Sequence, residues 1–122
     1  MGLVTREILS HGRKTERVAV PEWDGEIMIR ALSAAQQITF AAYVKDLGDA
    51  PGGMARSAAW MLTAAWVDED GKPVLPLGDV DALLESQTAE LLVDLGLKIS
   101  AISGFTPNAT VSAEKNSESS QS

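Results

Sequence analysis

The sequence predicts an α+β fold: an N-terminal β-hairpin, then a small bundle of about four helices, then a disordered C-terminal tail. Near the N-terminus, two segments of alternating polarity flank an Asp-Gly pair, which is typical of a hairpin. Farther along, apolar residues recur at helical spacing, and residues 106–122 carry almost no sizeable apolar side chain. We therefore expect an N-terminal arm at residues 1–14, one domain at residues 15–105 and a disordered tail at residues 106–122.

The hairpin is expected to have strands at residues 15–21 and 26–31, joined by a two-residue turn at Asp24 and Gly25. A type I′ turn needs positive φ at both central residues, which an Asp-Gly pair adopts readily. Pro21 has no N–H to donate to a neighbouring strand, so its strand lies at an edge of the sheet or ends there.

The two-residue turn places Val20 opposite Ile29, and alternate residues of each strand then share a face. The expected core face carries Val18, Val20, Ile27, Ile29 and Ala31. Two large apolar residues, Trp23 and Met28, fall on the outer face instead. Either a helix covers them or they contact another chain, and the sequence favours neither interpretation. Trp23 and Met28 are therefore the candidate protein-interaction residues.

The first helix is predicted at Ala34–Leu47. Ser33 followed three residues later by Gln36 fits a capping box, and Gly48 is a natural C-terminal stop. One apolar stripe on this helix is formed by Phe40, Val44 and Leu47.

The central helix is predicted at residues 54–67. It is apolar nearly all round, which is typical of a buried helix, and it is too short to span a bilayer. Trp60 and Trp66 would be its largest apolar surfaces. A charged turn at residues 68–73 ends it, and residues 74–76 return as a short extended piece.

Two more helices follow. Asp79 is the expected cap of the first, whose apolar residues are Leu83 and Leu84. The second begins near Thr88 and ends at Gly104, and its apolar stripe consists of Leu91, Leu92, Leu95, Ile99 and Ile102. Gly96 lies inside this helix, where a glycine either costs about 1 kcal/mol or permits a close helix contact.

Composition excludes several classes of partner. The net charge of −7 should repel nucleic acid and anionic lipid, so neither is an expected partner. The chain has no cysteine, which excludes disulfides and thiolate metal sites and fits a reducing cytosol. His11 is the only histidine and lies in a predicted polar loop, and no histidine–carboxylate cluster has metal-binding spacing. We therefore expect no enzyme activity, no cofactor and no metal.

Two blocks of the sequence resemble the tail assembly chaperones of phages with long non-contractile tails. In the first, a Lys-Thr-Glu strand beginning at Lys14 leads to a glycine turn. An Ile-Met-Ile-Arg-Ala-Leu-Ser strand beginning at Ile27 and a helix follow. In the second, residues 66–74 precede Asp79, Val80 and a leucine-rich helix. The resemblance covers residues 13–102, and its motifs belong to the fold rather than to a catalytic site.

The resemblance implies a non-enzymatic protein made in the cytoplasm of the infected host. Such chaperones bind the tape measure protein and keep its apolar helical segments soluble. They also help to recruit tail tube protein, tend to form homo-oligomers and are absent from the finished virion. Two alternatives remain open at this point: another small phage structural protein, such as a tail completion or adaptor subunit, and a small enzyme or regulator.

The resemblance also implies a second, longer product made by a −1 ribosomal frameshift. If Glu114, Lys115 and Asn116 are encoded GAA-AAA-AAC, the message contains a slippery A-AAA-AAC heptamer inside the polar tail. The alternative is that a Lys-Asn pair is ordinary in such a tail. The codon of Lys115 distinguishes the two.

Overall fold

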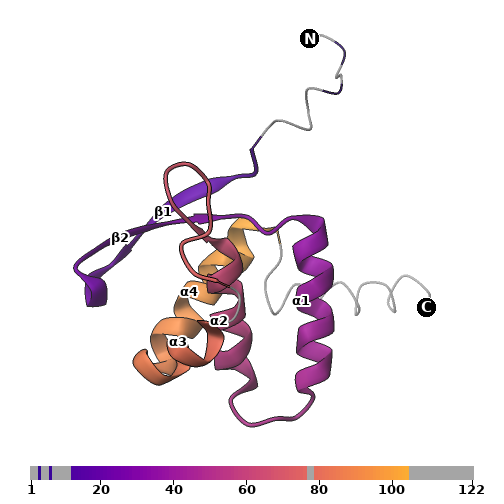
Figure 1. Ribbon diagram of the computed structural model, residues 1–122, viewed down its shortest axis with the longest axis vertical. Helices are drawn as coiled ribbons and strands as arrows, with labels where there is room; N and C mark the ends of the chain where they lie inside the picture. The colour runs from indigo at the N-terminus through magenta and orange to yellow at the C-terminus, as the bar shows by residue number, and fades with distance from the viewer. Residues whose placement is uncertain (1–2, 4–5, 7–11, 77–78, 105–122) are drawn as a thin grey trace, which may run out of the picture.

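The computed structural model describes residues 3, 6, 12–76 and 79–104 (Figure 1). His11, most of the predicted arm and the predicted disordered tail at residues 106–122 lie outside the described residues. In chain order the elements are β1 (Thr15–Val20), a 3₁₀ turn (Pro21–Trp23), β2 (Gly25–Arg30), α1 (Ala34–Leu47), α2 (Gly53–Ala65), β3 (Trp66–Val67), α3 (Val80–Ser86) and α4 (Ala89–Ile102). The predicted α+β order, a hairpin followed by four helices, is confirmed.

The core face of the hairpin is confirmed, but the predicted register is wrong. Val20 lies opposite Gly25, four positions (29 − 25) from the expected partner Ile29. The connection is a four-residue loop, in which Pro21 starts a 3₁₀ turn and Asp24 takes the left-handed conformation at φ 54°. An even shift preserves the faces, because side chains alternate with period two. The buried side chains therefore remain those predicted, namely Val18, Val20, Ile27, Ile29 and Ala31.

The central helix is confirmed as buried, but it ends earlier than expected. Every residue from Ala58 to Ala65 is buried, and α2 packs against α1, α3, α4 and β2. Trp66 and Val67 leave the helix and form β3, the third strand of the sheet, opposite Ile29 and Met28. Aromatic and β-branched residues suit a strand, and β2 has free backbone groups for them to pair with.

The charged turn after β3 is held by its own aspartate. The Oδ1 atom of Asp68 accepts hydrogen bonds from the backbone N–H groups of Asp70 at 2.8 Å and Lys72 at 3.0 Å. Gly71 has a φ of 80°, which favours glycine. The chain then returns beside β3, because Val74 N–H donates to Trp66 O at 3.1 Å.

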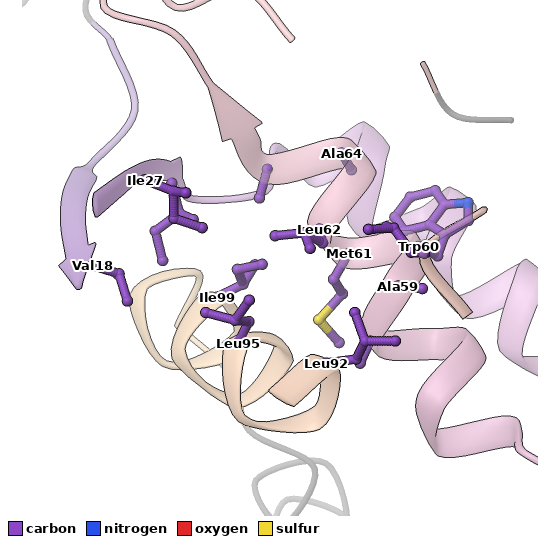
Figure 2. Packing of buried hydrophobic residues seen from close by; sticks show 14 of the residues in the cluster. Val18, Ile27, Ala59, Trp60, Met61, Leu62, Ala64, Leu92, Leu95 and Ile99 are labelled. Atoms are coloured by element: carbon purple, nitrogen blue, oxygen red, sulfur yellow. The ribbon is translucent and has the colours of Figure 1, made fainter. Parts of the chain in front are cut away.

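Helices α2 and α4 pack very closely against each other and enclose the core together with the hairpin. A Cβ atom added at Gly96 would lie 2.9 Å from the Cβ of Ala58, so the glycine permits a close helix contact. Figure 2 shows Val18 of β1 and Leu62 of α2 around the same core as the α4 residue Ile99. The apolar stripe predicted for α4 is buried at Leu91, Leu92, Leu95 and Ile99.

The caps decide where the helices begin. The predicted capping box of α1 is present: Ser33 Oγ accepts from Gln36 N–H, and Gln36 Oε1 accepts from Ser33 N–H. Thr88 caps α4 by accepting from Leu91 N–H at 3.2 Å. Asp79, in contrast, precedes α3 without a side-chain cap bond.

In the part of the chain that the structure describes, no helix combines the length and apolarity that crossing a membrane requires.

Candidate functional site

The two candidate interaction residues do not share a face. Trp23 belongs to the 3₁₀ turn and is half-buried, with its ring stacked on Trp66 at a centroid distance of 5.3 Å. Its Nε1–H donates to Gln87 Oε1 at 2.8 Å. The expectation that Trp23 lies on the outer face is therefore wrong, because the four-residue loop turns the ring toward the core. Met28 does lie on that face, half-buried and opposite Val67. A role for either residue in contacting another chain stays a prediction.

A groove lies between α1, α2 and α4. It has a cavity volume of about 580 Å³. Its apolar walls are formed by Phe40, Val44 and Leu47 of α1, Met54 and Met61 of α2, and Val93 and Leu97 of α4. The floor includes the small residues Ala58 and Gly96. A groove of this size and composition is suited to apolar contacts.

Side-chain size explains why the groove exists. On one side of α2, the contact of Ala58 with Gly96 brings α4 close. On the other side, the rings of Phe40 and Tyr43 lie 5.4 Å and 6.0 Å from the ring of Trp60 and hold α1 away. Because α4 lies close to α2 and α1 is held farther from it, a channel remains along the face of α2 that carries Met54, Ala58 and Met61. Consistent with this, α1 has no buried residue.

Several apolar side chains of the groove are open to solvent. Met54 is 70% exposed, Leu97 46% and Val44 40%. The hydroxyl groups nearby are already used: Ser57 Oγ donates to Gly53 O at 2.7 Å, and buried Ser100 Oγ contacts Met61 Sδ at 3.4 Å. The lining thus offers apolar surface and few free polar groups.

The N-terminal end of α1 is anchored by polar contacts. Arg13 Nη1 donates to Gln36 Oε1 and to Ala31 O, and Gln37 Nε2 donates to Ser103 O at 3.3 Å. Burial, with a smaller contribution from the positive charge of Arg30, lowers the pKa of Arg13 from its ordinary value. These contacts lie at the opposite end of α1 from Leu47, so they fix the helix without filling the groove.

The groove offers little for acid–base or metal chemistry. Asp49 is the one ionisable side chain among its described lining residues. Over the described ranges, no group of three or more His, Cys, Asp or Glu side chains could hold a metal ion.

The groove was not predicted, although the sequence contains a sign of it. Val93 and Leu97 are four residues apart and form a second apolar stripe on α4, outside the predicted one. Met54 lies in the first turn of α2, where it extends past the buried core. What the sequence could not show is that α1 stands apart from α4.

Comparisons with known proteins show a similarity among solved structures. No family model matches the sequence, and no curated protein matches it. Among solved structures, the chain is similar to the bacteriophage HK97 tail assembly chaperone, with a TM-score of 0.50 and 20% sequence identity. The match covers 67% of this chain and 84% of that one. The expected fold, like that of a phage tail assembly chaperone, is thereby confirmed.

Proposed function

We propose that this chain is a phage tail assembly chaperone that holds an apolar helical segment of the tape measure protein in the groove between α1, α2 and α4. The observation that carries the proposal is the half-open apolar lining at Met54, Leu97 and Val44, in a chain with the chaperone fold. The protein acts by binding, without catalysis, in the cytoplasm of the infected host. Tail tube protein is its second proposed partner.

The groove suits an amphipathic helix better than a rigid small molecule. Helix-in-groove recognition places apolar side chains at helical spacing into an apolar channel, and the channel here follows the outer side of α2. Met54 and Met61 add adaptability, because an unbranched thioether side chain can fit differently shaped neighbours. Adaptability matters for a chaperone that must cover many different segments of one long helical protein.

The first test places a charge in the groove. Met54→Glu and Leu97→Glu should each weaken binding of a tape measure segment by about tenfold or more, because an unpaired carboxylate would enter an apolar contact. The fold should survive, since Met54 lies in the first turn of α2, where an acidic residue favours the helix. The measurement is the fraction of a co-expressed tape measure segment that stays in the soluble supernatant.

A matched control is available at Val74. Its exposed fraction of 42% is close to the 46% of Leu97, and it does not line the groove. Val74→Glu should keep the segment soluble to the same extent as the unchanged chain. Equal solubilisation by all three variants would exclude the groove as the binding site, and detection of this chain in finished virions would contradict the chaperone role itself.

A further inference from the structure

The groove has the same length on each of its three walls. Apart from Gly53 at the start of α2, its lining within the helices runs over residues 40–47 of α1, 54–61 of α2 and 93–100 of α4. Each of these stretches spans seven residues from first to last (47 − 40, 61 − 54, 100 − 93). At a rise of about 1.5 Å per residue, each wall is about 10 Å long, which is two helical turns. A helix in the groove therefore places two of its own turns against the walls.

Contacts between α2 and α4 divide the groove into levels. At one level, Ser100 Oγ lies 3.4 Å from Met61 Sδ. About one turn earlier on both helices, a Cβ atom added at Gly96 would lie 2.9 Å from the Cβ of Ala58. Because the two contacts advance in the same direction along both chains, α2 and α4 run parallel beside the groove.

Helix α1 runs the opposite way. The ring of Phe40 lies 5.4 Å from the ring of Trp60, the neighbour of Met61 in α2, whereas Leu47 precedes the short connection to α2 (Figure 1). Phe40 and Met61 thus mark one end of the groove, and Leu47 and Met54 mark the other. Met61 is buried and Met54 is exposed, so these are the deep end and the open end.

The middle of the groove is a hollow with a small floor and larger sides. Ala58 and Gly96 form the floor, and Val44 of α1 and Leu97 of α4 stand on either side of it. The floor is buried, whereas both side residues are exposed. A hollow of this kind accepts a large apolar side chain from another helix, as the holes of a coiled coil accept their knobs.

The open end of the groove carries a negative charge. Asp49 lies in the connection between α1 and α2, is exposed and belongs to the groove lining. The ion pairs that the structure shows for the described residues are Arg56 with Asp81 and Lys98 with Asp94, and neither includes Asp49. Its carboxylate is therefore available to a cation on a bound molecule.

We propose that the groove selects client helices with a two-turn pattern: apolar side chains at i, i+3 or i+4, and i+7, with a lysine or arginine one turn beyond the apolar residue at the open end. The outer two apolar side chains contact the deep and open ends. The middle one is large and enters the hollow over Ala58 and Gly96, and the cation pairs with Asp49. This selection rests on the proposed function and deepens it, because it states which segments of a long helical protein occupy the groove.

Synthetic peptides test the pattern with the unchanged full chain. The reference is an alanine-based helical peptide of about 16 residues, with leucine at i, i+4 and i+7 and a lysine one turn beyond each outer leucine. It should bind about tenfold or more tightly than a peptide of the same composition whose leucines are spread around the helix. Replacing the middle leucine with alanine should raise the dissociation constant more than replacing either outer leucine. Fluorescence anisotropy of labelled peptides gives the dissociation constants.

Filling the hollow tests its role in size selection. Val44→Phe should weaken binding of the reference peptide by about tenfold and abolish the preference for leucine over alanine at the middle position. Leu97→Phe should do the same from the opposite wall. Both positions are exposed, so the added ring does not enter the core. Ile38→Phe is the matched control, because Ile38 is an exposed residue of α1 outside the groove lining.

Charge reversal tests the role of Asp49. At low salt, Asp49→Lys should weaken binding of the reference peptide by about threefold, as expected for an exposed ion pair. Replacing one of the two peptide lysines with glutamate should restore the binding, and the lysine that responds gives the direction of the bound helix. Asp70→Lys in the turn after β3 carries the same change of charge outside the groove lining, and should leave the affinity unchanged.

The outcomes separate this selection from the proposed function. Equal binding of the ordered and spread peptides, or an undiminished preference for leucine in both phenylalanine variants, would overturn the two-turn pattern. Equal effects of the Asp49 and Asp70 substitutions would overturn the ion pair. Either result would leave the proposed function standing if Met54→Glu still reduces the solubility of a tape measure segment. Loss of that effect as well would overturn both.

Discussion

At the scale of single residues, Trp60 joins α1 to the buried core of the domain. It is 7% exposed, and the rings of both Phe40 and Tyr43 lie against it. Since α1 has no buried residue of its own, these aromatic contacts help to fix its position on the domain. The sequence predicted that Trp60 is buried, because it lies in a segment that is apolar nearly all round.

Trp60→Ala should lower the free energy of unfolding by roughly 3–5 kcal/mol, as truncation of a buried aromatic side chain does. The groove should also change shape, because α1 loses the ring that spaces it from α2. Chemical denaturation followed by circular dichroism measures the stability. A midpoint close to that of the unchanged chain would show that Trp60 does not hold α1 in place.

At the scale of elements, the predictions succeeded where residues within an element decide its bounds. They failed where contacts with residues far away in the sequence decide them. The boundaries of α1 follow from Ser33, Gln36 and Gly48, which lie at its own ends, and the predicted range is confirmed. The hairpin turn was predicted wrongly because Trp23 is held by Trp66 and by Gln87, residues far away in the sequence. An Asp-Gly pair favours a tight turn, and those tertiary contacts outweigh that preference.

The short strand β3 illustrates the same limit. Two residues are too few to show the alternating pattern of a strand. The prediction therefore assigned Trp66 and Val67 to the preceding helix, whose apolar run they continue. Only the presence of β2 beside them decides that they are extended. The groove could not be predicted for a similar reason, since it depends on the distance between two helices rather than on either one.

Caps supply a stability test at the scale of elements. Thr88→Ala should lower the free energy of unfolding by about 1 kcal/mol, because Leu91 N–H loses its acceptor. Asp79→Ala is the matched control: Asp79 occupies the same position before α3 but makes no side-chain cap bond. Urea denaturation of the two variants should separate them. Equal losses would mean that the hydrogen bond of Thr88 adds nothing to α4.

At the scale of the whole molecule, the hairpin and the groove lie on different sides of the domain. The hairpin side carries the open edge of β1, whereas the opposite side carries the groove between α1, α2 and α4. The order and type of the elements could be predicted from the sequence, but this arrangement depends on packing.

The sequence also predicts that residues 106–122 are dispensable for folding. They offer only Val111 as a sizeable apolar side chain, so a variant that ends at residue 105 should keep its free energy of unfolding within about 0.5 kcal/mol. Thermal and urea denaturation of the shortened and full chains provide the comparison. A loss of more than about 2 kcal/mol would show that this segment contributes to the stability of the domain.

The stack of Trp23 on Trp66 gives the molecule an optical consequence. Two indole rings held 5.3 Å apart, at an interplanar angle of 21°, couple their electronic transitions and produce a paired circular dichroism band. That band reports whether the hairpin tip is docked on the helices. Trp60, the third tryptophan of the chain, lies on the other side and responds through its fluorescence to changes beside the groove. The circular dichroism band of the stacked pair thus follows the hairpin tip in an unlabelled sample.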